Sequence, residues 1–404
     1  MALNIDLDGE FPGARRATYL DTAARSLLPA SSRAAALAML DHRMQGTANK
    51  DMMFATVERT RAAFAKLIGA EADEIAITKN ISEGVNIVAS SLPIGAGDNV
   101  IVCPDVEHPA NIYPWYNLTR RLGVEVRAVP ARDGQIDAQA FTAALDRRTR
   151  AVALSIISFS PGLRADLTAI ADACRTHDVF LFVDGAQSVG ILHTDVEALG
   201  IDGLAVSTQK GLLGPYGMGF LYVRQNWAER MMPVYLSRFG VDLGRTHEAA
   251  RGGADAPLMA GARRFDVGNY NYEAAVIADR SLALLASIGT EAIERHVVGL
   301  AHALAERLYA LGLPVAGGRP GPHLGPIVCV GRRGAGGHDS TEDVAMASLH
   351  RAVVEADVSM SVRQGMLRFS FHLFNTERDV ERVVGVARAW IEQSNARPRT
   401  SSAG

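Results

Sequence analysis

Two chemically reactive residues follow apolar runs in the middle of the chain. Asp184 ends the run 179–183 and precedes Gly185, and Lys210 ends the run 204–209 and precedes Gly211. A carboxylate and an amine at the ends of successive buried strands would lie at the carboxyl edge of a sheet, where open α/β sheets bind ligands. This pair suits pyridoxal phosphate (PLP). The lysine can form a Schiff base with the cofactor aldehyde, and the aspartate can keep the pyridine nitrogen protonated.

Each residue alone also fits an ordinary structural role. An aspartate after a strand is often a turn or capping residue, and Lys210 could be a surface lysine before a glycine-rich turn. The combination is more specific, because Gln187 follows Asp184 closely and Ser207 and Gln209 precede Lys210. The glycine-rich segment 211–219 is interpreted as a flexible stretch that can wrap a cofactor.

Short motifs along most of the chain resemble one family in that family's order. They run from Tyr19-Leu20-Asp21-Thr22-Ala23-Ala24 to Phe374-Asn375-Thr376-Glu377. The chain resembles the class V aminotransferase group of PLP fold type I enzymes, which includes cysteine desulfurases and isopenicillin N epimerase-like proteins. The resemblance implies an α/β fold with PLP as cofactor. It also implies a large domain with a mainly parallel seven-stranded sheet, a smaller C-terminal α/β domain, and a homodimer with shared active sites.

Composition is that of an ordinary globular protein. The chain has 404 residues, of which 48% are hydrophobic and 21% charged, and its net charge is −3. Neither nucleic acid nor a membrane is expected as a partner. The N-terminus lacks the basic and apolar regions of a signal peptide, so a cytoplasmic location is expected. The three cysteines, Cys103, Cys174 and Cys329, lie in or beside apolar runs and are expected to be free and buried.

Helix and strand patterns alternate through the middle of the chain. Helices are expected at 55–68, 82–92 and 165–177, and buried strands at 100–103, 151–157, 179–184 and 204–210. Continuous apolar strands separated by helices indicate a parallel sheet covered on both faces. Beyond residue 272 a long helix (273–311), a strand (326–330), a helix (342–355), a strand (367–373) and a helix (377–393) are expected. We expect an N-terminal segment (1–30), a large domain (31–272), a small domain (273–394) and a disordered tail (395–404).

The phosphate of PLP is expected at the start of the helix near residue 82, because a helix N-terminus binds anions. By resemblance, Ile81 and Ser82 lie at the phosphate, and Ser207 and Gln209 reach it. Many desulfurases carry histidine where this chain has Gln209. In the family, the segment corresponding to 264–269 crosses to the phosphate of the partner subunit. Gly268 and Asn269 are therefore expected in cofactor binding, although some relatives have threonine at the latter position.

The remaining site residues also come from the resemblance. His108 would stack on the pyridine ring, and Gln187 would bind the phenolic oxygen of the cofactor. Arg368 would receive the α-carboxylate of an amino-acid substrate, because its planar fork binds a carboxylate through two parallel bonds. Arg363 is a weaker candidate for substrate binding. Thr22 and Ala23 are expected to line the substrate pocket, and no metal site is predicted.

The candidate residues are compatible with a small number of reaction types. Lys210 can act as the base at Cα of a small amino acid, after which amino transfer, β-elimination or epimerisation can follow. A desulfurase needs a mobile cysteine near its C-terminal substrate loop. Here Cys329 lies in a predicted strand and no cysteine follows it. We expect an aminotransferase or a β-eliminating C–S lyase, with epimerisation as the alternative. A desulfurase is less expected. A ligand-sensing regulator is also less expected, because the family resemblance starts by Tyr19 and leaves no segment for a helix-turn-helix domain. A catalytically dead relative would be expected to lack Asp184, Lys210 or Arg368, and all three are present.

Overall fold

A seven-stranded sheet forms the centre of the structure, a computed structural model that describes residues 5–244, 246 and 249–396. The strand order is β2-β8-β7-β6-β5-β3-β4, and β8 alone runs against its neighbours. The predicted mainly parallel sheet is thus confirmed. Its strands are β2 (Ile75–Thr78), β3 (Asn99–Val102), β4 (Glu125–Ala128), β5 (Thr149–Ser155), β6 (Phe180–Asp184), β7 (Gly203–Ser207) and β8 (Gly219–Val223).

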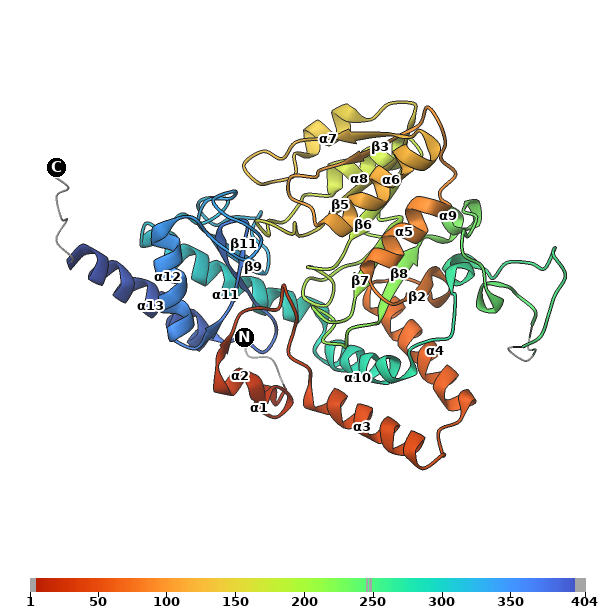
Figure 1. The fold of residues 1–404 in the computed structure, drawn as a ribbon, viewed down its shortest axis with the longest axis horizontal. Coiled ribbons are helices and arrows are strands. Elements are labelled where there is room, and N and C mark those ends of the chain that lie inside the picture. The colour runs from red at the N-terminus through yellow and green to blue at the C-terminus, as the bar shows by residue number, and fades with distance from the viewer. Residues whose placement is uncertain (1–4, 245, 247–248, 397–404) are drawn as a thin grey trace.

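Helices cover both faces of this sheet, which explains the uninterrupted apolar strands (Figure 1). Neighbouring residues along a strand enter different hydrophobic clusters, as Leu181 and Phe182 do in β6. One face packs on helices α5 (Ile81–Ser91), α6 (Tyr113–Leu122) and α9 (Gln225–Arg230). The other packs on α4 (Lys50–Leu67), α8 (Thr168–Thr176) and α10 (Tyr272–Ile288). Helix α3 (Ala30–Met44) lies along α10, and the short helix α7 (Ala138–Ala144) lies beside α8.

The C-terminal elements, blue in Figure 1, gather beside the large sheet around a smaller antiparallel sheet. This sheet has the order β11-β12-β9, with β9 (Ile327–Val330), β11 (Ser361–Arg363) and β12 (Met366–Ser370). Helices α11 (Thr290–Ala310), α12 (Val344–Glu355) and α13 (Glu377–Ala396) pack around it. The expected division into domains stays a prediction.

The N-terminal segment joins this C-terminal group. After helices α1 (Leu7–Glu10) and α2 (Pro12–Arg16), strand β1 (Thr18–Tyr19) pairs in parallel with β10 (Val358–Ser359). Asp21 forms a further bridge with Ser370 at the end of β12. The start of the chain is thereby fixed beside the small sheet, close to the residues that the sequence analysis placed in the substrate pocket.

Two sequence-based expectations need correction. The single helix expected over 273–311 is two helices, α10 and α11, because Gly289 takes a φ of +87° that an α-helix cannot contain. Helix α10 packs against α3 and α4. The disordered tail expected over 395–404 overlaps the last helix by two residues, since α13 continues to Ala396. Residues 397–404 of that predicted tail lie outside the described part of the chain.

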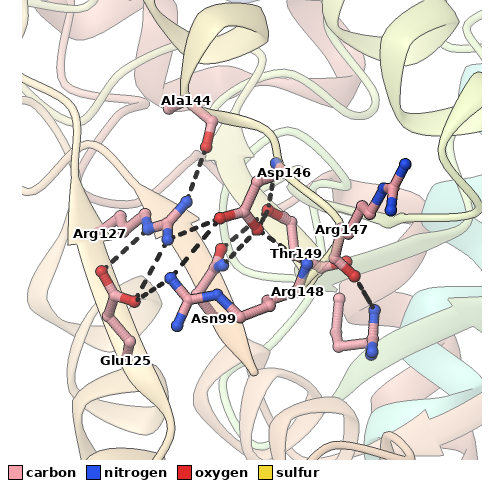
Figure 2. Close-up of polar contacts among 9 residues, drawn as sticks. Asn99, Glu125, Arg127, Ala144, Asp146, Arg147, Arg148 and Thr149 are labelled. Atoms are coloured by element: carbon pink, nitrogen blue, oxygen red, sulfur yellow. Dashed lines mark hydrogen bonds and ion pairs between the residues drawn. The ribbon is translucent and has the colours of Figure 1, made fainter. Parts of the chain in front are cut away.

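The amino edge of the large sheet is held by a network of polar side chains, drawn in Figure 2. Buried Asn99, at the start of β3, donates to Asp146 and accepts from Thr149, both at 2.9 Å. Arg127 of β4 pairs with Glu125 at 2.9 Å and with Asp146 at 2.8 Å. These groups bond to one another, so the network supports the sheet from the edge opposite the carboxyl end of β6.

Two further findings concern partners and metals. Within residues 5–244, 246 and 249–396, no helix combines the length and apolarity needed to cross a bilayer. The same residues contain no group of three or more His, Cys, Asp or Glu side chains suited to a metal ion.

Candidate active site

Asp184 and Lys210 lie at the carboxyl ends of two adjacent parallel strands of the large sheet, but the strand expected over 204–210 ends at Ser207. Asp184 is the last residue of β6, whereas Lys210 lies in the turn that follows the end of β7. The backbone N–H of Gly185 donates to the carbonyl of Ala205 at 2.9 Å, and so holds the two strand ends together. The turn after β7 is tight, because the Leu213 N–H donates to the Lys210 carbonyl at 3.0 Å.

The two charged groups act on one another. Burial lowers the pKa of Lys210 to about 8; Asp184 opposes this shift, while Arg368 and Arg363 add to it. The amine is therefore close to its deprotonation point at neutral pH, as a base must be. Burial raises the pKa of Asp184 to about 6, against the Ala186 N–H that it binds at 2.8 Å and the charge of Lys210. A buried carboxylate with this environment suits a cationic N–H partner.

A second buried carboxylate, that of Glu107, interacts with the charge of Asp184. Glu107 accepts hydrogen bonds from the Ser155 N–H at 2.7 Å, the Ser155 hydroxyl at 2.5 Å and the Asn111 amide at 2.9 Å. Ser155 is the strand partner of Asp184. Burial raises the pKa of Glu107 to about 7, and the negative charge of Asp184 adds to the shift. Glu107 directly precedes His108, and no local sequence pattern distinguishes it from an exposed carboxylate.

His108 follows Glu107 in the sequence, and its ring lies within reach of the charges of Lys210 and Arg368. Its Nδ1 accepts a hydrogen bond from the Ala110 N–H at 3.1 Å, so the proton of the neutral ring lies on Nε2. Desolvation, Lys210 and neighbouring cations lower the pKa of His108 to about 4. A neutral imidazole with an exposed face can lie flat on an aromatic ring, which fits the predicted stacking role. Phe159 supports the ring edge-on, with centroids 4.8 Å apart.

Arg368 lies in β12 with only 1% of its surface exposed. Its Nε donates to the hydroxyl of Ser361 at 3.0 Å, and its Nη1 is buried without a partner among the described residues. Burial lowers the pKa of Arg368 to about 10, which leaves the guanidinium charged at neutral pH. A buried cation with an unused donor fits the predicted binding of a carboxylate. Arg363 lies on the neighbouring strand β11.

The N-terminal segment closes the site from the side of the small sheet. The Gln187 amide donates to the Ala23 carbonyl at 3.1 Å, and the Ala23 N–H donates to the Ser370 hydroxyl at 2.8 Å. Thr22 is buried, and its hydroxyl has no partner within the described residues. The predicted pocket residues Thr22 and Ala23 are therefore brought to Gln187, three residues beyond Asp184.

The predicted phosphate residues also come together in part. The N–H of Ile81, the first residue of α5, donates to the Ser207 hydroxyl at 2.8 Å. Ser82 occupies the next helical position, where backbone N–H groups lack partners within the helix. Gln209 contacts the N-terminal segment, because its carbonyl accepts from the Ser26 N–H at 2.8 Å. A helix N-terminus that carries Ser82 and contacts the Ser207 hydroxyl suits a phosphate group, whereas Gln209 has no contact with this helix among those described.

Gly268 and Asn269 line a cavity whose lining does not include Asp184 or Arg368. This cavity of about 250 Å³ is also lined by Thr78, Lys79 and Gly217, and Lys210 is not part of its lining. Asp266 anchors this segment by accepting hydrogen bonds from Arg61 at 2.7 Å and from the Ile77 N–H at 2.9 Å. Within one chain, these two predicted cofactor residues are not grouped with Lys210, Asp184 and Arg368.

Comparison with known proteins identifies the class. The family described as aminotransferase class V matches residues 18–383, so the chain belongs to that family. A probable cysteine desulfurase of Methanothermobacter thermautotrophicus is 30% identical over 337 residues, covering 80% of this chain and 81% of the relative. The apo structure of the cysteine desulfurase of Thermococcus onnurineus NA1 superposes with a TM-score of 0.82 at 25% identity, covering 97% of this chain and 99% of that one.

A further solved structure shares the fold. It is the complex of the cystine C–S lyase C-DES with cysteine persulfide, which aligns with a TM-score of 0.82 at 22% identity. The alignment covers 93% of this chain and 99% of that chain. These likenesses confirm the PLP fold type I architecture. The chain is a PLP-dependent enzyme of the transferase or lyase kind. Assignment to the epimerase branch stays a prediction.

All three cysteines are free and buried, as expected. Cys329 lies in β9 directly opposite Arg368 of β12, so the two side chains share one face of the small sheet. Burial raises the pKa of the Cys329 thiol to about 12, although Arg368 opposes the shift. A buried thiol of this kind is a poor nucleophile.

Proposed function

We propose that this protein is a β-eliminating C–S lyase that acts on a free α-amino acid at the site of Lys210, Asp184 and Arg368. The observation that carries the proposal is the position of Arg368. Its buried Nη1 donor, which has no partner among the described residues, and the amine of Lys210 belong to one group of interacting charges. An amino acid held by its α-carboxylate on Arg368 would present its α-amino group and Cα to Lys210.

When bound, PLP supplies an aldehyde for covalent attachment of amines and a ring that stabilises negative charge developing at Cα. The residues that would hold it are Asp184 at the ring nitrogen, His108 on the ring face and Gln187 at the phenolic oxygen. Ile81, Ser82, Ser207 and Gln209 would hold the phosphate. Asp184 suits the first role because its carboxylate is buried and because the positive charge of Lys210 favours its ionised form.

Lys210 is the proposed base. Its lowered pKa leaves a substantial neutral fraction near pH 7 to 8, and a neutral amine can remove the proton from Cα. The same amine can return that proton to the leaving group or to another carbon. Elimination and amino transfer therefore require the same residues. Elimination breaks the Cβ–S bond, and its electron pair leaves on sulfur, whereas amino transfer leaves that bond intact and delivers the proton to carbon.

Sulfur chemistry is favoured by the relative named a probable cysteine desulfurase. A persulfide route would need an accessible thiolate, whereas Cys329 is buried with a raised pKa. Elimination, in which sulfur leaves with its substituent, has no such requirement. Amino transfer is the second candidate, and the name of the matching family favours it.

We also propose that the active enzyme is a homodimer in which Gly268 and Asn269 complete the site of the partner. The cavity that they line does not include Lys210, Asp184 or Arg368 of the same chain, which supports this arrangement. Exposed apolar side chains lie near them in sequence or in space, namely Met232, Tyr235, Leu236 and Val267, which are 42–69% exposed. Free buried cysteines are typical of a reducing compartment, which supports the predicted cytoplasmic location.

The absorption spectrum of purified protein with PLP tests the cofactor site. We expect a visible band in the wild type and none in Lys210→Ala. Addition of a substrate amino acid should yield keto acid and ammonia in equal amounts without any amino acceptor. Formation of keto acid only when a second keto acid is supplied would replace elimination by amino transfer. A protein that stays colourless with PLP would contradict both.

Mixing two inactive variants tests the shared site. Lys210→Ala and Asn269→Asp chains should be inactive separately, because one lacks the base and the other places a negative charge near a phosphate. Mixed dimers should contain one site with neither change, and activity should return to a fraction of the wild-type value. Absence of any recovery in mixed dimers, with dimerisation verified by sedimentation, would contradict the sharing of sites.

A further inference from the structure

The hairpin of the small sheet places two arginines on one face. Strands β11 and β12 are joined by Gln364 and Gly365, whose φ values of +49° and +85° suit a two-residue hairpin turn. Ser361 lies opposite Arg368, and Arg363 lies opposite Met366. Residues opposite one another share a face, and so do residues two apart along a strand. Arg363 and Arg368 are therefore diagonal neighbours on the same side of the hairpin.

Both guanidinium groups are largely withdrawn from water. The side chain of Arg363 is 14% exposed, and Arg368 is 1% exposed. Each has a buried nitrogen without a partner among the described residues, Nε in Arg363 and Nη1 in Arg368. The charges of both arginines lower the pKa of Lys210, after the larger effects of burial and Asp184. The proposed α-carboxylate on Arg368 would use only one of these two cations.

The partner of Arg363 is a surface carboxylate. Asp339 pairs with Arg363 Nη1, yet 73% of the Asp339 side chain is exposed. Because Asp339 is largely solvated, it gives up little hydration to form the pair and can return to water when a competing anion binds Arg363. Asp21 is a second carboxylate near both arginines, but it is held by the N-terminal segment through its bridge with Ser370. Asp339 is thus the anion that can leave without moving the sheets.

The segment that carries Asp339 forms a wall of the site. The ring of His338 stacks on Phe159 with centroids 6.0 Å apart and an interplanar angle of 10°. Phe159 in turn packs edge-on against His108, and the Arg368 guanidinium lies 5.7 Å from its centroid. One aromatic ring therefore joins His338 to the proposed cofactor-stacking residue and to the proposed carboxylate-binding residue. Asp339 pairs with Arg363, and its negative charge also acts on Arg368.

We propose that Arg363 binds a second anionic group, carried on the side chain of the amino-acid substrate, and that Asp339 fills this position until the substrate displaces it. The substrate class is then an α-amino acid whose Cβ carries sulfur and whose short side chain ends in a carboxylate, sulfinate or similar anion. This inference rests on the proposed function, because it assumes that Arg368 holds the α-carboxylate. It adds the chemical class that the site selects.

Binding of unreactive acids tests the proposal without turnover. Succinate and butyrate have equal chain length, but only succinate carries a second carboxylate. Their dissociation constants for the PLP-loaded enzyme can be measured by calorimetry. We expect succinate to bind roughly 10- to 100-fold more tightly than butyrate, from charge-assisted hydrogen bonds to a second guanidinium. In Arg363→Gln this difference should disappear while butyrate binding stays close to that of the wild type.

Asp339→Asn gives an effect of opposite sign. Removal of the competing carboxylate should tighten succinate binding roughly two- to fivefold and leave butyrate binding unchanged. A general disturbance of the segment would change both acids alike. Arg333→Gln is the matched control, since Arg333 lies on the same segment and its Nε binds the Gln364 side chain at 3.0 Å. It should change neither constant.

The outcomes separate this inference from the proposed function. Equal binding of the two acids by the wild type, or a succinate preference that survives Arg363→Gln, would overturn the role of Arg363. Either result leaves the PLP band and its loss in Lys210→Ala unaffected. Absence of the visible band from the wild-type protein with PLP would instead overturn the proposed function. Tightening of both acids by Asp339→Asn would show that Asp339 only restricts access, which contradicts its role as a stand-in for the substrate anion.

Discussion

Gly190 and Gly211 lie backbone against backbone between the two turns that carry the proposed catalytic residues. A Cβ on Gly190 would stand 2.2 Å from the Gly211 carbonyl oxygen, and a Cβ on Gly211 would stand 2.2 Å from the Val189 carbonyl oxygen. Lys210 precedes Gly211, and the turn through Gly190 follows Asp184. The two backbone segments can approach this closely only because neither position carries a side chain.

Gly211→Ala should therefore displace Lys210. Since a misplacement of about 1 Å can cost roughly 10²-fold in rate, we expect turnover to fall by one to two orders of magnitude. Gly299→Ala is the control, because no atom lies within 4 Å of a Cβ at that position of α11. It should be neutral or stabilising by about 0.5–1 kcal/mol. Steady-state kinetics and PLP affinity give the comparison, and unchanged turnover in Gly211→Ala would refute the proposed spacing role.

Glu107 should give the cofactor-free protein a distinctive pH dependence. Burial and the charge of Asp184 raise its pKa from the ordinary value of 4.5 to about 7. Between these two values the native state binds more protons than the unfolded chain. The Glu107 contribution to the free energy of unfolding must then decrease as pH rises. Glu107→Gln should make the slope of stability against pH more positive between pH 5 and 7, by up to about 1 kcal/mol per pH unit.

Urea denaturation at several pH values measures this slope. Glu381→Gln is a suitable control, since a hydrogen bond from Arg307 lowers the pKa of Glu381. Stability from a lowered carboxyl pKa is lost only as pH falls below the ordinary value of 4.5, so this variant should keep the wild-type slope above pH 5. Identical slopes for Glu107→Gln and the wild type would show that Glu107 titrates normally.

Arg61 and Asp266 form a buried ion pair at 2.7 Å, with side-chain exposures of 0% and 2%. Arg61→Met would leave the Asp266 carboxylate buried without its cation, which typically costs about 3–5 kcal/mol. Arg59→Met, on the same helix, removes an arginine that is 58% exposed and pairs with Asp279 at 3.4 Å. Its cost should stay below about 1 kcal/mol. Equal urea midpoints for the two variants would contradict the assigned importance of the buried pair.

Local patterns were sufficient for the proposed catalytic pair. Asp184 and Lys210 were found because apolar runs predict strands, and the ends of adjacent parallel strands meet. The sequence also singles out the glycines after Lys210, but the structure gives them a different role. They were interpreted as flexible, whereas Gly211 permits a close backbone contact. The break at Gly289 was missed because apolar periodicity continues on both sides of it.

Contacts between distant segments could not be predicted from these patterns. Glu107 binds Ser155, 48 residues away, and no local signal indicates that the carboxylate is buried behind Asp184. Phe159 lies outside any recognised motif, yet it joins His338, His108 and Arg368. The pairing of Asp339 with Arg363 likewise depends on how a glycine-rich segment folds over the small sheet.

Cys329 provides a test between elimination and a persulfide route. Burial raises the pKa of Cys329 to about 12, so the thiol is protonated at pH 7, and only the thiolate attacks sulfur. We expect Cys329→Ala to change the rate of product formation less than about twofold, apart from the effect of a small cavity on stability. A desulfurase that used this residue would lose nearly all activity. Native protein should also resist a thiol-reactive dye, and all three cysteines should react after denaturation. Rapid labelling of the native enzyme, together with an inactive Cys329→Ala, would establish the persulfide route in place of the proposed elimination.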